Sequence, residues 1–371
     1  NYAGINHQRR YGADVISRIE QANSGKATEL TECIRKDIKE GILSLLQNGG
    51  VELSKISDIV ISANSTMGHL FLGYSVEGLG SYPFTPFDID LVEVHGEEIF
   101  PDLKWNGKIT LLPGISAFVG GDVVSGLCKC GFHKIERPTL FIDLGTNGEL
   151  ALGTKERILV SSTAAGPVFE GGNITWGTGS IPGAISEAAI EDDAIKVKTI
   201  YNKSPVGICG TGLIAIISVL LNLEVLEKDG LLQGSFAETG YVLARTANDE
   251  WITITQSDIR EFQLAKAAIQ TGIQVLLKEA GVLASQLHRV YIAGGFGSKL
   301  NIKQAIQVGL LPKECSGKIK AVGNTSLEGS ISYLLDNHKV SAFDIIKKDS
   351  KNINLAEEKS FTDLYTSYIN F

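Results

Sequence analysis

The chain has 371 residues and a formal net charge of −8, with 43% hydrophobic and 20% charged residues, a composition typical of a soluble globular protein. Its length allows two domains with full cores, and its acidic balance excludes a nucleic-acid partner, because binding phosphate backbones requires an excess of Lys and Arg. No apolar run reaches the ~18 residues of a membrane span, no secretory signal opens the chain, and the five cysteines are scattered; we therefore expect a cytoplasmic protein without a membrane partner.

The first part of the chain alternates predicted helices and strands. Ile34, Ile38 and Ile42 share one helical face, and Gly49-Gly50 ends that helix. The predicted elements are, in chain order, a helix at 31–47, a strand at 56–63, a loop at 64–66 followed by a short helix, a strand at 108–112, and a helix at 123–130 opened by Gly120-Gly121-Asp122.

The second part repeats this order behind an antiparallel three-strand meander. Asp258 is expected to cap the longest helix, with Glu261 completing a capping box. The tail at 350–371 is expected to act as a docking helix or an oligomer contact, as in a homodimer. The predicted elements are strands at 139–144, 150–153 and 157–161, a glycine-rich region at 163–212, helices at 212–223 and 258–281, strands at 289–293 and 319–322, and a helix from Asn324.

This repetition predicts two similar halves around a cleft. Strands that enter helices through glycine-rich loops indicate parallel α/β sheets, whose sites lie at the carboxyl ends of the strands. We expect the first half to span residues 1–137. The second half would span 138–371, with a glycine-rich insertion at 163–205 and the C-terminal tail. Within that insertion, residues 169–183 resemble a mobile flap.

Residues 139–153, TLFIDLGTNGELALG, carry more polar groups than a hairpin needs. Asn147-Gly148 alone would make a two-residue turn. Asp143 ends a buried strand, and the small residues after it could wrap anionic oxygens with backbone N–H groups. A carboxylate at that position could also hold Mg²⁺ through water. From these residues alone, a plain hairpin and a phosphate loop remain open.

A second glycine-rich loop occurs in RVYIAGGFGSKLN at 289–301. There a strand runs directly into Gly294, Gly295 and Gly297 at the start of a helix. Glycine lets backbone approach a ligand closely, and a helix N-terminus favours an anion. This is not the dinucleotide fingerprint, because no βαβ unit with an acidic ribose partner follows. Together with the earlier hairpin, the loop favours a nucleotide site.

Several other positions have both a functional and a structural interpretation. Gly210 and Gly212 open a helix, where they could touch ribose or phosphate or simply make a turn. Ser65, in Asn64-Ser65-Thr66, could face a γ-phosphate or cap a helix. Asp122 could be a catalytic base, although capping is the simpler role. His69 and His133 could approach cobalt, although an ordinary core or surface histidine explains them better.

The two loops, in this order, resemble the second half of the actin, sugar kinase and heat-shock ATPase (ASKHA) superfamily. Six segments further resemble the ATPase region of reductive activators of corrinoid proteins. They are NHQRRYGADVISRI (6–19), IDLGTNGELALG (142–153), STAAGPVFEG (162–171), GICGTGL (207–213), DIREFQLAKAAIQTGI (258–273) and YIAGGFG (291–297). The resemblance implies an actin-like α/β core with two ribonuclease-H-like halves.

The resemblance also implies an activity and its cofactors. ATP and Mg²⁺ would bind, and hydrolysis would drive reduction of Co(II) to Co(I) on a corrinoid iron–sulfur protein, with a ferredoxin-like electron donor, in corrinoid-dependent methyl transfer. Three alternatives are a small-molecule kinase of the same superfamily, an activator of 2-hydroxyacyl-CoA dehydratases, and a docking module for a corrinoid protein that ignores ATP. The second would need cluster cysteines at a dimer interface, and no suitable pair stands out.

Site roles follow from the resemblance residue by residue. Asp143 would position Mg²⁺ through water, and Glu149 would help to position the metal or the water. The residues implied as nucleotide contacts are Gly145, Thr146, Asn147 and Gly148 for phosphate, Gly210 and Gly212 for ribose or an outer phosphate, and Gly294, Gly295 and Gly297 for adenosine. Asp122, selected from its place at a helix start and not from the resemblance, is the third catalytic candidate.

Two features of the family are missing from this sequence. Its first D-x-G-T-T hairpin would precede Tyr11, and none is present, so we expect the first half to lack its N-terminal hairpin and the chain alone to be a poor ATPase. The family's iron–sulfur module needs ferredoxin-type cysteine spacing, which Cys128-x-Cys130 does not provide. An iron–sulfur cluster is therefore expected only in a segment absent from this chain.

Overall fold

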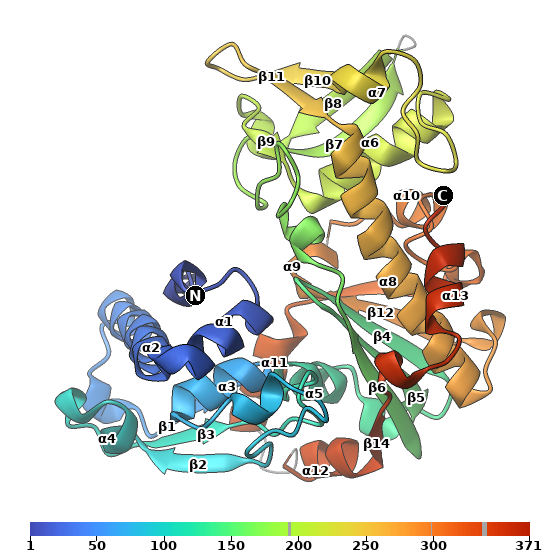
Figure 1. Cartoon of the computed structure of the whole chain (residues 1–371). Coiled ribbons are helices and arrows are strands. Elements are labelled where there is room, and N and C mark those ends of the chain that lie inside the picture. Colours follow the sequence, from blue (N-terminus) through green and yellow to red (C-terminus); the bar gives the residue numbers. More distant parts are fainter. Residues whose placement is uncertain (192–193, 298, 336–339) are drawn as a thin grey trace. The chain divides into compact units, whose positions relative to one another are not determined.

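The computed structural model divides the chain into two compact units. The first unit comprises Asn1–Lys134 and Asn324–Asn352, and the second comprises Ile135–Gly323 and Ile353–Phe371. The structure describes residues 1–191, 194–297, 299–335 and 340–371 (Figure 1). Within these ranges, none of the helices combines the length and the apolar character needed to cross a membrane.

The first unit contains a three-strand sheet in the order β1-β3-β2, in which β1 runs parallel and β2 antiparallel to β3. Its elements are α1 (Val15–Gln21), α2 (Ala27–Gly49), β1 (Asp58–Ile61), α3 (Ser65–Leu72), β2 (Val92–His95), α4 (Gly96–Ile99), β3 (Lys108–Leu111), α5 (Gly121–Lys129), α11 (Thr325–Leu335), α12 (Val340–Asp349) and β14 (Ser350–Asn352).

Two helices, α2 and α3, pack on this sheet through apolar faces, of which the one on α2 was predicted from the sequence. Ile34 of α2 and Phe71 of α3 join Ile109 of β3 in one buried cluster. The helix α2 starts four residues before its predicted start, and Gly50 ends it in the left-handed conformation. Burial of this apolar stripe stabilises α2 more than intrinsic propensity does, because an isolated helix of this length is marginal in water.

The second unit contains a sheet with the strand order β13-β12-β4-β5-β6, a smaller sheet β8-β7-β9, and a β10-β11 hairpin. Its elements are β4 (Thr139–Leu144), β5 (Gly148–Thr154), β6 (Arg157–Thr163), β7 (Ala184–Glu191), β8 (Ala194–Thr199), β9 (Gly207–Ile208), α6 (Gly210–Asn222), α7 (Phe236–Thr239), β10 (Tyr241–Arg245), β11 (Trp251–Ile254), α8 (Gln256–Ala280), β12 (Arg289–Ala293), α9 (Gly294–Gly297), α10 (Ile302–Gln307), β13 (Ile319–Gly323) and α13 (Phe361–Ser367).

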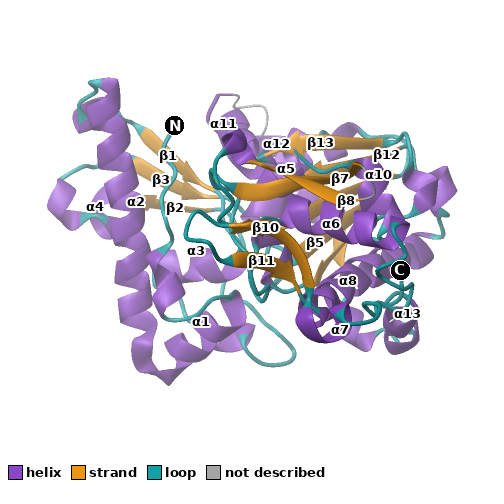
Figure 2. Cartoon of the chain, turned by 90° about the horizontal axis from the view of Figure 1, so that it is seen from above, coloured by secondary structure: helices purple, strands orange, loops and turns teal. Residues whose placement is uncertain are grey.

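The core of the second unit forms where α8 covers the meander β4-β5-β6 (Figure 1). Phe262, Ile269 and Ile273 of α8 are fully buried. The helix lies so close to the strands that a Cβ added at Gly272 would be 2.5 Å from Leu150. In the same unit, α6 packs against β7 (Figure 2). These helices hold the ends of the strands, and the loops that follow them, in fixed positions.

The cap of α8 differs from the prediction. Thr255 is the N-cap, its hydroxyl accepts a hydrogen bond from Asp258 N, and the Asp258 carboxylate accepts one from Thr255 N at 2.8 Å. Asp258 is therefore the third residue of the helix, and the predicted box with Glu261 is wrong. The buried Asp258 carboxylate also accepts bonds from the backbone N and the hydroxyl of Thr175, at 2.7 and 2.9 Å.

The C-terminal residues dock on α8 of the same unit. The buried Lys266 ammonium donates to the carbonyls of Tyr368 and Asn370, and Gln263 donates to that of Ile369 at 3.0 Å. Burial lowers the pKa of Lys266 to about 8. The Phe371 ring stacks on Phe262. The predicted docking role of the tail is thus fulfilled within the chain itself.

We predict that Asp258→Ala lowers the free energy of unfolding by about 2–4 kcal/mol, because it removes a helix cap and takes the acceptor away from the N–H groups of Thr175 and Thr255. The measurement is a denaturant titration followed by circular dichroism. Ser257→Ala, at the exposed neighbouring position, is the control and should change stability by less than about 0.5 kcal/mol. Equal effects of the two variants would contradict this role of Asp258.

Candidate functional site

A row of polar side chains crosses the second unit's sheet at the carboxyl end of β4. Asp143 stands opposite Glu149 of β5, which in turn stands opposite Ser162 of β6. The Ser162 hydroxyl donates to Glu149 at 3.4 Å. On the other side, Asp143 pairs in parallel with Ala293, the last residue of β12. The register therefore brings the end of the D-x-G-T strand beside the start of the Gly-Gly loop.

The turn after Asp143 contains three residues, 145–147, rather than the two of an Asn-Gly hairpin. Leu144 pairs with Gly148, so Gly148 belongs to β5. A Cβ added at Gly148 would lie 2.0 Å from Ile269 of α8, and close packing alone therefore accounts for this glycine. Gly145 N donates to the Asn147 carbonyl at 3.0 Å, so one N–H of the predicted phosphate nest is used inside the turn.

Gly294 lies against this turn at the start of α9. Its φ of +86° belongs to the left-handed region, and an added Cβ would be 2.9 Å from Asp143 Oδ1. Only glycine therefore fits between β12 and the Asp143 carboxylate without strain. Gly295, the next residue, is exposed, and an added Cβ there would have no atom within 4 Å. Gly297 ends α9.

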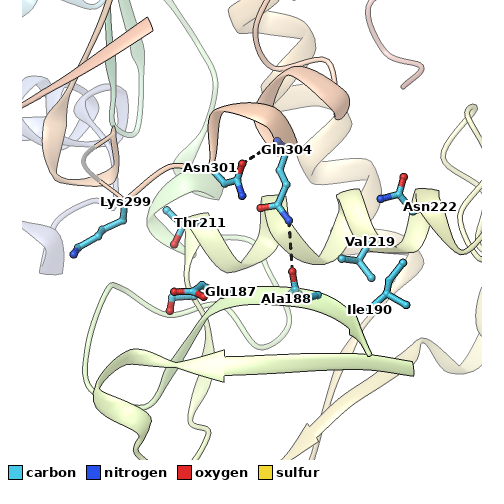
Figure 3. Close-up of a pocket in the computed structure, with 11 residues that line it drawn as sticks. Glu187, Ala188, Ile190, Thr211, Val219, Asn222, Lys299, Asn301 and Gln304 are labelled. Atoms are coloured by element: carbon cyan, nitrogen blue, oxygen red, sulfur yellow. Dashed lines mark hydrogen bonds between the residues drawn. The ribbon is translucent and has the colours of Figure 1, made fainter. Parts of the chain in front are cut away.

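A cavity of about 540 Å³ lies within the second unit between β7, α6 and the segment that follows α9 (Figure 3). Glu187 of β7, Thr211 of α6 and Lys299, Asn301 and Gln304 beyond α9 are among its lining residues, and in Figure 3 the Lys299 side chain extends away from the others. At the edge of the cavity, Gln304 Nε2 donates a hydrogen bond to the Ala188 carbonyl at 3.5 Å. Carboxylate, hydroxyl and amide groups around such a volume suit a polar molecule with several donors and acceptors.

Residues near two of the predicted glycine loops, the one at 210–212 and the one at 294–297, line this same cavity. Thr211 lies between Gly210 and Gly212, both buried, and a Cβ at Gly212 would be 2.0 Å from the Ile185 carbonyl of β7. Gly212 is thus explained by packing, whereas Thr211, which the sequence analysis did not select, lines the cavity. Lys299 and Asn301 lie just beyond Gly297. Asn301 caps α10, a local signal that could have directed attention to this segment.

Part of the segment predicted as a flap, 169–183, is held by contacts with α8, whereas residues 179–182 are exposed. Val168 and Phe169, in a 3-10 turn (Pro167–Glu170), are buried, and Phe169 packs edge-on against Phe262 of α8. Thr175 is held by Asp258, as described above. At the end of the turn, Glu170 Oε2 accepts a 2.7 Å hydrogen bond from the Thr146 hydroxyl. Sequence analysis missed Glu170, because nothing local links it to the hairpin.

The candidates in the first unit have local structural roles. Asp122 lies in the first turn of α5, where its carboxylate accepts from Val123 N at 2.9 Å. Asn64 caps α3, and the Ser65 hydroxyl donates to the Ser116 carbonyl. His69 is buried, with Nδ1 bonded to the Ser65 carbonyl at 2.7 Å and Nε2 accepting from Phe87 N. Burial lowers the pKa of His69, as expected of a neutral core histidine.

The donor set at the end of β4 is compatible with Mg²⁺. Asp143 and Glu149 offer hard carboxylate oxygens side by side on adjacent strands. Among the described residues, no three His, Cys, Asp or Glu side chains are placed to hold a metal ion together. Mg²⁺ bound here would therefore take most of its ligands from water and from a ligand's oxygens, which is its usual preference.

The cysteines show no cluster-like arrangement. Cys33, Cys128, Cys209 and Cys315 are buried and Cys130 is half-buried, and none forms a disulfide in the described chain. Desolvation raises the pKa of Cys315 to about 11 and also raises that of Cys33. Thiols held in the neutral form are poor metal ligands. These positions fit the structural interpretation of small, buried residues.

The chain is similar to known proteins over almost its whole length. A family model described as the C-terminal domain of RACo, the ASKHA domain, matches residues 137–371, and the RACo middle region matches residues 1–135. The curated corrinoid activation enzyme RamQ of Eubacterium limosum is 32% identical over 97% of this chain and 64% of its own length. The [Co(II) methylated amine-specific corrinoid protein] reductase of Methanosarcina barkeri is 27% identical over 75% of this chain and 54% of its own.

A solved structure agrees with these sequence matches. The reductive activator for corrinoid, iron-sulfur protein superposes with a TM-score of 0.89 at 34% identity, covering 99% of this chain and 61% of that one. This chain thus spans less than two thirds of the length of each of these three relatives.

We predict that Gly294→Ala lowers the free energy of unfolding by about 1–2 kcal/mol, because alanine is strained at positive φ and its Cβ would meet Asp143. Gly295→Ala, one residue later, is the matched control and should change stability by less than about 0.5 kcal/mol. Chemical denaturation of both variants provides the comparison. A Gly294→Ala variant as stable as the control would show that the space between residue 294 and the Asp143 carboxylate can accommodate a methyl group.

We further predict a pH-dependent effect of Asp122→Asn. Burial raises the pKa of Asp122 to about 6, above its value in the unfolded chain. The folded state therefore binds the extra proton between about pH 4 and pH 6, and this contribution to stability falls as pH rises through that window. Asp122→Asn should raise the unfolding free energy by about 1–3 kcal/mol at pH 8 and leave it unchanged near pH 4. If Asp122→Asn instead lowers the unfolding free energy at pH 8, the favourable interaction of the Asp122 charge with the start of α5 is larger than the cost of burying that charge.

Proposed function

The chain belongs to the RACo family, matching its ASKHA domain and middle region, and on that premise we propose that it binds ATP with Mg²⁺ and couples ATP hydrolysis to the reductive activation of a corrinoid protein. Family membership also confirms the actin-like α/β fold class expected from the motifs. The observation that carries the proposal is the convergence of the Asp143 turn and the Gly294 loop at one edge of one sheet.

In this proposal the nucleotide's parts are divided between two neighbouring regions of the second unit. The turn at 145–147 and the N-terminus of α9 take the phosphates, because backbone N–H groups and a helix start favour anions. The base and ribose occupy the cavity, where Glu187, Thr211 and Asn301 supply acceptors and donors for sugar hydroxyls and ring nitrogens. Lys299, on the segment between these regions, supplies a positive charge.

Asp143 and Glu149 are assigned to the metal and to water. Two carboxylates directly opposite each other on adjacent strands repel, and a divalent cation between them and the phosphates relieves that repulsion. When bound, Mg²⁺ would neutralise charge that develops on the phosphates during hydrolysis. Glu149, held by Ser162, would orient the attacking water. Asp122, in the first turn of α5, keeps its predicted role as a candidate base.

The energetic need for ATP follows from the reduction assigned to this chain, for which one relative's name gives a Co(II) corrinoid protein as the starting state. Reducing Co(II) to Co(I) is unfavourable for ordinary cellular donors, and each ~59 mV of the gap costs about 1.4 kcal/mol for one electron. The chain can supply that energy only by binding the cobalt states with different affinities, because a ligand shifts an equilibrium by its differential affinity alone. The electron itself is assigned to a donor outside residues 1–371, such as an iron–sulfur cluster or a ferredoxin-like protein.

We predict that Asp143→Ala reduces ATP hydrolysis on the order of 100-fold while changing the unfolding free energy by no more than about 1 kcal/mol, because it removes a metal-positioning group and relieves a carboxylate pair. Phosphate release by the 371-residue chain is the assay, with ADP affinity from calorimetry as a second measurement. Glu156→Ala, in the turn at the opposite end of β5, is the control and should hydrolyse ATP like the parent chain.

Other outcomes would identify the alternatives. Hydrolysis unchanged in Asp143→Ala would refute the assigned role. Transfer of the γ-phosphate to a small molecule instead of water would identify a kinase. A corrinoid protein captured equally with and without nucleotide would indicate a docking module. Reduction of Co(II), followed by its absorbance with a low-potential donor, should require ATP if the proposal holds.

A further inference from the structure

The carboxylate of Glu170 lies directly on the turn to which we assign the phosphates. Its Oε2 accepts the Thr146 hydroxyl hydrogen at 2.7 Å, and its Oε1 lies 3.7 Å from the position of a Cβ added at Gly145. Phosphate oxygens bound by this turn would need the same hydroxyl as a donor. A carboxylate at this place is therefore both a rival acceptor and a like charge.

The backbone that carries Glu170 is fixed independently of this hydrogen bond. Val168 and Phe169, the two preceding residues, are buried in the core between α6 and α8. Gly171, the next residue, has a φ of +85°, and an added Cβ would lie 2.5 Å from Thr178, so the chain folds tightly back on itself. Glu170 is thus presented to the turn by a rigid support, while its own exposed side chain is free to rotate.

We propose that Glu170 is a positioning residue that competes with nucleotide phosphate for Thr146. This inference rests on the proposed function. When phosphate enters the turn, the Glu170 carboxylate swings away from Thr146, and when phosphate leaves, it returns. The residue thereby weakens the binding of anionic nucleotides and speeds their release, while the turn at 167–170, which packs against α6 and α8, stays in place.

A direct metal-binding role for Glu170 is less compatible with the geometry. The described part of the chain places no third carboxylate together with Asp143 and Glu149 in a metal-binding group. The Glu170 carboxylate instead accepts a hydrogen bond from the Thr146 hydroxyl. The two roles predict opposite effects of removing the Glu170 charge on nucleotide affinity. If Glu170 competes with phosphate, nucleotide binds more tightly in the absence of a metal. If Glu170 binds a metal, nucleotide binds more weakly in its presence.

The test compares the affinities of the 371-residue chain for ADP and for adenosine, measured by calorimetry without Mg²⁺ and then with it. Glu170→Gln should bind ADP about tenfold more tightly than the parent chain without Mg²⁺, and adenosine equally well, because only ADP carries phosphate. Glu170→Asp, which keeps the charge, should stay within about threefold of the parent chain for ADP. Glu261→Gln is the control: it removes an α8 carboxylate that accepts a hydrogen bond from Asn173, three residues after Glu170, and it should change neither affinity.

The outcomes separate this inference from the function on which it rests. ADP bound by the parent chain but no more tightly by Glu170→Gln would overturn the role of Glu170 and leave the nucleotide site intact. Weaker ADP binding by Glu170→Gln only in the presence of Mg²⁺ would also overturn it, in favour of a metal ligand. ADP bound by neither protein at millimolar concentration would overturn the proposed function and this inference together. Equal tightening for ADP and adenosine would show a structural effect and overturn the competition.

Discussion

The parallel pairing of β4 with β12 is the constraint on which the site depends. It places Asp143 beside Ala293, so that a hairpin turn and a glycine-rich helix start, far apart in the sequence, meet at one edge of the sheet. A shift of one residue in this register would turn the Asp143 side chain to the opposite face of the sheet. Buried strands on both sides of β4 and the cover of α8 fix that register, because any slip would expose Leu140, Ile142 and Leu144 or bury polar groups.

This arrangement places like charges together and makes the site unfavourable for stability. Asp143 and Glu149 occupy opposed positions on adjacent strands, and Glu170 adds a third carboxylate near the same turn. A chain selected for stability alone would replace one member of the opposed pair, since like charges across a strand pair are destabilising. Carboxylates concentrated at a strand end next to glycines are the kind of donor set that supports the Mg²⁺ site proposed above.

The parts of the fold that were predictable are those determined by local pattern. The apolar faces of α2 and α8 and the strand β4 repeat with a helical or an extended period, so a short window of sequence reveals them. The two loops were also located, because glycine and aspartate directly after an apolar strand mark the start of a loop in the sequence. The error at α8 arose from the same reasoning, since Thr255 and Asp258 are both good caps and only their mutual hydrogen bonds decide between them.

What escaped prediction depends on contacts across long stretches of chain. Glu170 reaches Thr146 only because Phe169 is buried against α8. Glu187 lines the cavity by virtue of the pairing of β7 with β8 and β9, and its strand, AISEAAIE, gives no local sign of it. Gly148, predicted as a phosphate contact, has in addition a packing role that the sequence did not reveal, because an added Cβ would lie 2.0 Å from Ile269. Local pattern locates loops, whereas tertiary packing decides which of their side chains face a ligand.

The rigidity of these supports has a consequence for how nucleotide binding could influence a protein partner. Coupling between two sites is reciprocal, so a partner whose affinity changes with the bound nucleotide must change the nucleotide's affinity by the same factor. Such coupling needs an element with two arrangements that both ligands bias. Phe169 and the Thr175–Asp258 bonds hold the backbone of the 167–175 segment in place, so that element is not the loop as a whole. A side chain such as Glu170, exposed and carried on that fixed backbone, can give up its donor, the Thr146 hydroxyl, to a phosphate oxygen by a change of rotamer. Because the backbone around Glu170 is closely packed, a change of rotamer at this one charged side chain is the simplest way to give the segment two arrangements.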